Sequence, residues 1–178
     1  PAFWGDEAAS IMSAERPLPP DRLYFLNPGQ TLDVGDRTLT AFRPPLFDNP
    51  ATVGLYDPRS GTCFTSDCFG APLASAEEAT ATDVRYIAPA ELAARQLLWA
   101  SVDSPWVHLV DQVKFDRTLD LLAAFKPAAI LSTHLPPAID RTDQLLTTAH
   151  TAPSAPPFTG PDQLALEAML RQFEPLAN

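Results

Sequence analysis

The sequence is short of cysteine, of basic residues and of long apolar runs. Its two cysteines, Cys63 and Cys68, are too few for a disulfide framework and are typical of reduced thiols in a cytoplasmic protein. No stretch approaches the ~20 apolar residues needed to cross a bilayer. No basic segment followed by an apolar run marks a secretory signal at the N-terminus either. We therefore expect a cytoplasmic protein with no membrane partner.

Basic residues are both few and scattered. The chain carries 12 Lys and Arg residues against 22 Asp and Glu residues, which gives a formal net charge of −10. Nucleic-acid binding depends on clustered Lys and Arg side chains that neutralise phosphates. The sequence therefore argues against a nucleic-acid partner.

What the sequence does contain is typical of one globular α/β domain. Its 178 residues suit a single domain, and 46% hydrophobic residues with 19% charged residues predict a packed core. Alternation and turn residues predict strands, whereas apolar residues at helical spacing after Gly70 predict helices. The predicted strands cover residues 2–4, 23–26, 31–34, 37–43, 52–56, 62–66 and 128–132. The predicted helices cover residues 6–14, 88–100, 107–113, 115–125 and 163–173, and a proline-rich loop covers residues 149–163.

Three polar residues stand at strand ends or in a turn, where they could bind a ligand. Asp67 follows an apolar strand just before Gly70, and His134 follows the apolar run at residues 128–131. Asp48 lies in an Asp-Asn-Pro turn. Each also has an ordinary structural interpretation, because Asp commonly caps turns and a His can bond to its own loop. Cys63, Cys68, His108 and His150 are interpreted as structural, the cysteines as small buried side chains.

Several short segments together resemble a known family. They are PLFDNP at 45–50, the strand at 52–57, CFTSDCFG at 63–70, ASVDSPW at 100–106 and ILSTH at 130–134. Their order and spacing are similar to those of the C-terminal half of a metallo-β-lactamase-fold domain, more narrowly its flavodiiron or oxygen-binding di-iron branch. The resemblance implies an αβ/βα sandwich, present here as antiparallel strands followed by helices.

The resemblance also implies a metal site. Asp67 would bridge two metals, His134 would complete the second and Asp48 would attend the first, at a position where the family has His. The family's first motif, a His-x-(His/Glu)-x-Asp-His cluster, has no counterpart in residues 1–178. We therefore expect an incomplete domain that needs its N-terminal half or a partner subunit, and we expect no complete di-metal site in this chain alone.

Three functions follow from the resemblance. The first is an iron-dependent reductase of dioxygen or nitric oxide, and the second is a zinc-dependent hydrolase such as an esterase, lactonase or thioesterase; both would act on a small molecule. The third is an interaction module that binds no metal. Two structural expectations accompany them: Asp67 and His134 should lie within ~4–6 Å of each other, and one face of the sheet should be exposed and apolar.

Overall fold

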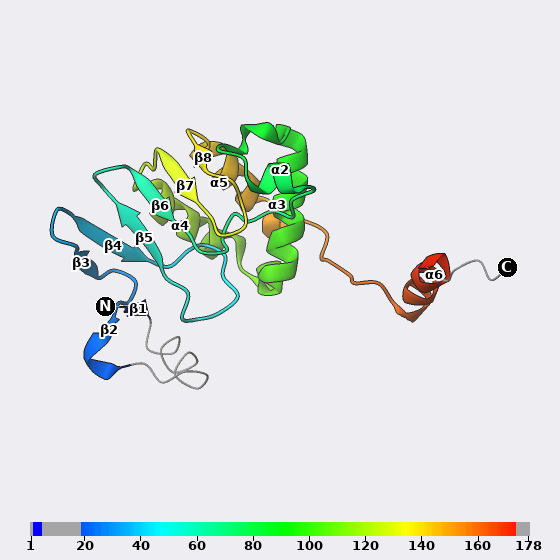
Figure 1. Cartoon of the computed structure of the whole chain (residues 1–178), viewed down its shortest axis with the longest axis horizontal. Helices are drawn as coiled ribbons and strands as arrows, with labels where there is room; N and C mark the ends of the chain where they lie inside the picture. The colour runs from blue at the N-terminus through cyan, green and yellow to red at the C-terminus, as the bar shows by residue number, and fades with distance from the viewer. Residues whose placement is uncertain (1, 5–18, 174–178) are drawn as a thin grey trace.

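A six-stranded mixed sheet forms the centre of the fold in a computed structural model that describes residues 2–4 and 19–173 (Figure 1). The strands are β3 (Thr31–Asp33), β4 (Thr38–Phe42), β5 (Gly54–Asp57), β6 (Thr62–Phe64), β7 (Ala129–Leu131) and β8 (Ala138–Ile139), in that spatial order. Neighbours are antiparallel except for β6 and β7, which are parallel. A separate parallel pair joins β1 (Ala2–Trp4) to β2 (Leu23–Phe25).

Local turn chemistry explains the antiparallel part of the sheet. Between β5 and β6 the turn ends at Gly61, whose φ of 67° is in the left-handed region that favours glycine. The carboxylate of Asp57 accepts hydrogen bonds from the backbone N–H of Arg59 and the hydroxyl of Ser60, both at 2.9 Å. This turn joins the two predicted strands in an antiparallel hairpin.

Helices follow the hairpin and cover one face of the sheet (Figure 1). They are α2 (Ala76–Ala79), α3 (Pro89–Asp103), α4 (Gln112–Ala123) and α5 (Thr142–His150), with short 3-10 turns η1 (Pro20–Arg22), η2 (Val84–Tyr86), η3 (Pro105–Leu109) and η4 (Ala152–Ser154). Helix α6 (Gln163–Phe173) lies apart from the sheet (Figure 1). The predicted helix at 6–14 lies outside the described residues. The prediction of a helix at 107–113 is wrong, because η3 ends at Leu109 and Asp111 caps a new helix by accepting from the backbone N–H of Lys114 at 2.9 Å.

The main core lies between the helices and one face of the sheet. Cys63 pairs with Ile130 in the β6–β7 register, and both side chains are fully buried against residues of α3, α4 and α5. Cys68 is also buried, and both cysteines are free thiols, as predicted. Burial raises the pKa of Cys63 to about 12, so this thiol stays protonated.

The opposite face carries an apolar row across four strands. Ala41, Leu55, Phe64 and Leu131 are successive partners in the strand register, so their side chains share this face. Phe64 is 44% exposed, whereas Ala41 is buried in a small second cluster that includes Leu26. The expected apolar face is thus exposed around Phe64 on β6, whereas its part around Ala41 on β4 is covered by the second cluster.

Candidate metal centre

Two loops that follow the parallel strands β6 and β7 form the candidate site. Parallel strands end at the same edge of a sheet, so the loops after them lie side by side. The backbone of Thr133 donates to the carbonyl of Ser66 at 2.9 Å, and that of Ala71 donates to the carbonyl of His134 at 3.1 Å. The backbone of Thr65 donates to the carbonyl of Leu131, also at 2.9 Å. These bonds fix the position of one loop against the other.

The loop that carries Asp67 has an uncommon backbone. Ser66 and Phe69 have φ values of 52° and 67°, a region that residues other than glycine rarely occupy. Hydrogen bonds hold this shape, since the Gly70 backbone donates to the carbonyl of Asp67 at 3.0 Å and the Thr65 hydroxyl donates to that of Cys68 at 3.1 Å. Such strain costs on the order of 1–3 kcal/mol per residue and is concentrated at functional sites.

Trp99, on α3, contacts both of the loops that carry Asp67 and His134. Its indole N–H donates to the backbone carbonyl of Asp67 at 3.0 Å, and its ring centroid lies 4.5 Å from that of His134. Gly70 makes room for the indole, because a Cβ atom there would come within 2.6 Å of the indole nitrogen. One tryptophan thus positions both loops.

The candidate ligands converge as the sequence predicted. His134 Nε2 lies 3.0 Å from Asp67 Oδ1, which confirms the expected proximity of these two side chains. Asp48, Asp67 and Asp103 each place a carboxylate oxygen within 4.8 Å of the others. Asp48 is exposed, whereas Asp67 and Asp103 are half-buried. The three residues singled out from the sequence therefore share one rim with a fourth.

Asp103 is the residue that sequence reasoning missed. It is the last residue of α3, in the ASVDSPW segment that contributes to the family resemblance, and it was given no role. A carboxylate at the C-terminal end of a helix is electrostatically unfavourable, which was a usable signal. Burial raises the pKa of Asp103, and the nearby charges of Asp67 and Asp48 raise this pKa further. A hydrogen bond from the Ser104 hydroxyl lowers it, but by less. Three mutually repelling carboxylates favour a bound cation.

The donor set fits one cation and does not fit a complete di-iron centre. The three carboxylates suit a hard or borderline ion such as Mn²⁺ or Fe²⁺, and His134 lies 3.0 Å from one of them. Two metals need more than four protein donors. Among the described residues, the other histidines are bonded elsewhere: His108 to Ser101 at 2.9 Å and His150 to Asp116 at 2.7 Å.

The fold is the metallo-β-lactamase-like α/β fold found in flavodiiron proteins. Rubredoxin oxygen:oxidoreductase from Desulfovibrio gigas is similar over 85% of this chain and 36% of its own, with a TM-score of 0.66 and 18% identity. The flavodiiron protein from Giardia intestinalis is similar over 85% of this chain and 35% of its own, with a TM-score of 0.65 and 15% identity. At such identities the likeness shows the fold alone.

A third solved structure is shorter. The chemotaxis sensor ODP from T. denticola is similar over 82% of this chain and 56% of its own, with a TM-score of 0.61 and 14% identity. This chain therefore spans only about a third of the first two proteins and just over half of the third. No protein-family model matches the sequence, and neither does any curated protein. Within the described residues, every helix is too short or too polar to span a membrane.

Proposed function

We propose that this chain supplies part of a metal centre in a protein of the flavodiiron type. The observation that carries the proposal is the convergence of three carboxylates from separate elements, with His134 Nε2 3.0 Å from a carboxylate oxygen of Asp67. Asp67, His134 and Asp48 would hold the metal, with Asp67 between the other two, and Asp103 would add a carboxylate. Iron bound in such a centre would pass electrons from an external donor to dioxygen or nitric oxide.

The roles of the surrounding residues follow from the geometry. Trp99 fixes the carbonyl of Asp67 and the ring of His134, so both side chains are already oriented before a cation arrives. A cation bound by both side chains would take the place of the 3.0 Å contact between imidazole and carboxylate. It also offsets the repulsion among the three carboxylates.

We further propose that the remaining ligands come from the first half of the fold or from a partner subunit. Two features support this. The described residues offer four donors, too few for two metals. The apolar row around Phe64 and the neighbouring Ile139, 44% and 40% exposed, is suited to packing against a second sheet. A hydrolase that uses zinc gains no such support, because catalytic zinc sites use mainly His and Cys ligands.

Cation binding to the purified chain tests the proposal. We expect Mn²⁺, followed by electron paramagnetic resonance under anaerobic conditions, to bind at one site. Asp67→Asn should weaken binding by about tenfold or more, since a charged ligand is lost. Asp120→Asn is the matched control, because Asp120 is exposed on α4 and belongs to no carboxylate cluster among the described residues. Equal Mn²⁺ binding by wild type and Asp67→Asn would contradict the proposal, as would a folded wild type that binds none.

A further inference from the structure

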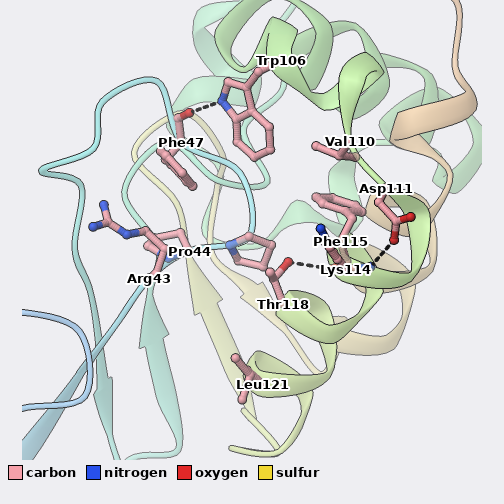
Figure 2. Close-up of a pocket in the computed structure, with 11 residues that line it drawn as sticks. Arg43, Pro44, Phe47, Trp106, Val110, Asp111, Lys114, Phe115, Thr118 and Leu121 are labelled. Atoms are coloured by element: carbon pink, nitrogen blue, oxygen red, sulfur yellow. Dashed lines mark hydrogen bonds between the residues drawn. The ribbon is translucent and has the colours of Figure 1, made fainter.

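A second site lies beside the carboxylate cluster. It is a cavity of about 420 Å³ between the loop that precedes Asp48 and the segment from η3 through α4 (Figure 2). Cavities that bind small molecules commonly measure ~300–1,000 Å³ and have mostly apolar walls with a few polar groups. Figure 2 shows Phe47 and Trp106 on one side of this cavity, with Phe115 and Lys114 on the α4 side.

The walls of the cavity are already held in place. The Trp106 indole N–H donates to the backbone carbonyl of Phe47 at 2.8 Å, and the two ring centroids lie 4.9 Å apart at 45°. Pro45 and Phe115 are buried. Arg43 donates to the carbonyl of Thr52 at 2.7 Å and to that of Pro50, and its guanidinium lies 5.1 Å from the Phe47 ring centroid. Because these side chains are already ordered, ligand binding costs little free energy for fixing them.

Two cations at this cavity lack acidic partners. Arg43 and Lys114 both line it, and within the described part of the chain neither lies within 4.0 Å of a carboxylate oxygen. Asp111 also lines the cavity, but its carboxylate accepts the backbone N–H of Lys114 and caps α4. The lining thus carries two cations and one carboxylate, and this net positive charge is complementary to an anion.

We propose that this cavity binds an aromatic carboxylate. The ring lies between Phe47, Trp106 and Pro45, where offset or edge contacts with the two aromatic side chains favour a planar aromatic body. The carboxylate lies toward Lys114, with Arg43 as a second, more distant cation. Apolar walls alone would bind any hydrophobic molecule of suitable size. The two cations favour an aromatic carboxylate over the corresponding neutral amide, because a charge-assisted hydrogen bond is stronger than a neutral one.

The proposed ligand site adjoins the carboxylate cluster and does not depend on a metal. Phe47 directly precedes Asp48, and Trp106 follows Asp103 by three residues. The hydrogen bond between Trp106 and Phe47 therefore ties together the two segments that carry those carboxylates. A ligand held against both rings would rest beside the candidate metal centre, so its binding can be measured in metal-free protein.

Titration of metal-free chain with 1-naphthoate tests the inference, and 1-naphthamide serves as a neutral analogue. Isothermal titration calorimetry would give the affinities, and the indole N–H resonance of Trp106, assigned from Trp106→Phe, would locate the ligand. We expect saturable naphthoate binding that shifts this resonance, and at least about tenfold weaker binding of the amide. Lys114→Gln should lower naphthoate affinity to about that of the amide.

Lys126→Gln is the matched control, because Lys126 is the other lysine of the chain and lies beyond the C-terminal end of α4, outside this cavity. It should bind naphthoate as the wild type does. Both lysines are exposed, so neither change should alter the unfolding midpoint. Equal affinity for acid and amide, an unshifted Trp106 resonance, or equal losses in the two lysine variants would each overturn the inference, and so would the absence of saturable binding.

Discussion

At the scale of single residues, the candidate metal centre depends on a side chain that binds nothing itself. Trp99 contacts both His134 and the backbone of Asp67 from one position on α3. Its indole fits there only because residue 70 is glycine. The geometry of the ligands is therefore set by packing beneath them as much as by the loops that carry them.

Gly70→Ala should disturb the site through Trp99 alone. The new Cβ would lie 2.6 Å from the indole nitrogen, so the indole must shift and its bond to Asp67 must lengthen or break. We expect a loss of ~1–3 kcal/mol in the free energy of unfolding, as overpacking usually causes, together with weaker Mn²⁺ binding. Urea unfolding measures the first effect. Gly160→Ala is the control, since its Cβ would meet no atom closer than 3.8 Å; equal effects in both variants would refute the role of Trp99.

Asp103→Asn should have opposite effects on the metal-free protein and on cation binding. The change removes one of three clustered charges while an amide oxygen can still accept from the Ser104 hydroxyl. With chelator present, we expect the free energy of unfolding of the variant to exceed that of the wild type by up to ~1 kcal/mol. Mn²⁺ affinity should fall. A variant that is less stable without metal and binds Mn²⁺ normally would contradict the assignment of Asp103 to the cluster.

At the scale of elements, the hairpin of β5 and β6 is fastened to the β3–β4 turn by an ion pair. Arg37 donates to Asp57 Oδ2 at 2.8 Å, and Asp57 is buried. Burial by itself raises the pKa of Asp57, but hydrogen bonds from Arg37, Ser60 and the Arg59 backbone outweigh it and leave this pKa below its usual value. A carboxyl group with a lowered pKa stabilises the fold above its unfolded pKa of ~4 and loses that contribution as the pH falls through its folded value.

Asp57→Asn should therefore destabilise the protein in a pH-dependent way. The difference in unfolding free energy between wild type and variant should be largest near neutral pH and should shrink as the pH falls from ~4 toward the lowered pKa of the folded wild-type carboxyl group. Chemical unfolding at pH 7 and pH 3 gives the comparison. A difference that stays constant between these two pH values would show that the charge of Asp57 contributes nothing.

The elements also show what the sequence could and could not reveal. The strands from β3 to β6 were predicted, because alternation and turn residues such as Gly61 are local signals. Helix α5 was missed: its N-cap is Arg141, which makes no side-chain cap bond, and its buried residues include Thr148. Helix α6 was predicted from its apolar spacing, yet Leu164 is 72% exposed, so amphipathic spacing did not imply burial here.

The site was predictable in part for the same reason. Asp67 and His134 follow strands that pair in parallel, and the family resemblance placed them together although 67 positions separate them. Asp103 reaches the cluster only because the end of α3 packs beside the loop after β6. That contact is tertiary: the unfavourable place of a carboxylate at the end of α3 marks Asp103 as unusual, but it does not specify which residues Asp103 contacts.

At the scale of the whole molecule, the apolar row that includes Phe64 should govern association. Burying apolar surface stabilises by ~25 cal/mol per Å², so an exposed row favours any contact that covers it. We expect the purified chain to self-associate with rising concentration, and Phe64→Asp to shift it toward monomer in light scattering. Leu109→Asp is the control, because Leu109 is 88% exposed on η3 and not on the sheet. A monomeric wild type at all concentrations would mean that this face needs no cover.

The central claim is that Asp48, Asp67, Asp103 and His134 form part of a metal centre that this chain alone does not complete. Anomalous X-ray diffraction from crystals of the purified chain soaked with Mn²⁺ tests it most directly, since it gives the position and number of bound ions. We predict one anomalous peak within coordination distance of Asp67 and at least two of the other three residues. Two ions held wholly by this chain, or a peak remote from these side chains, would contradict the claim.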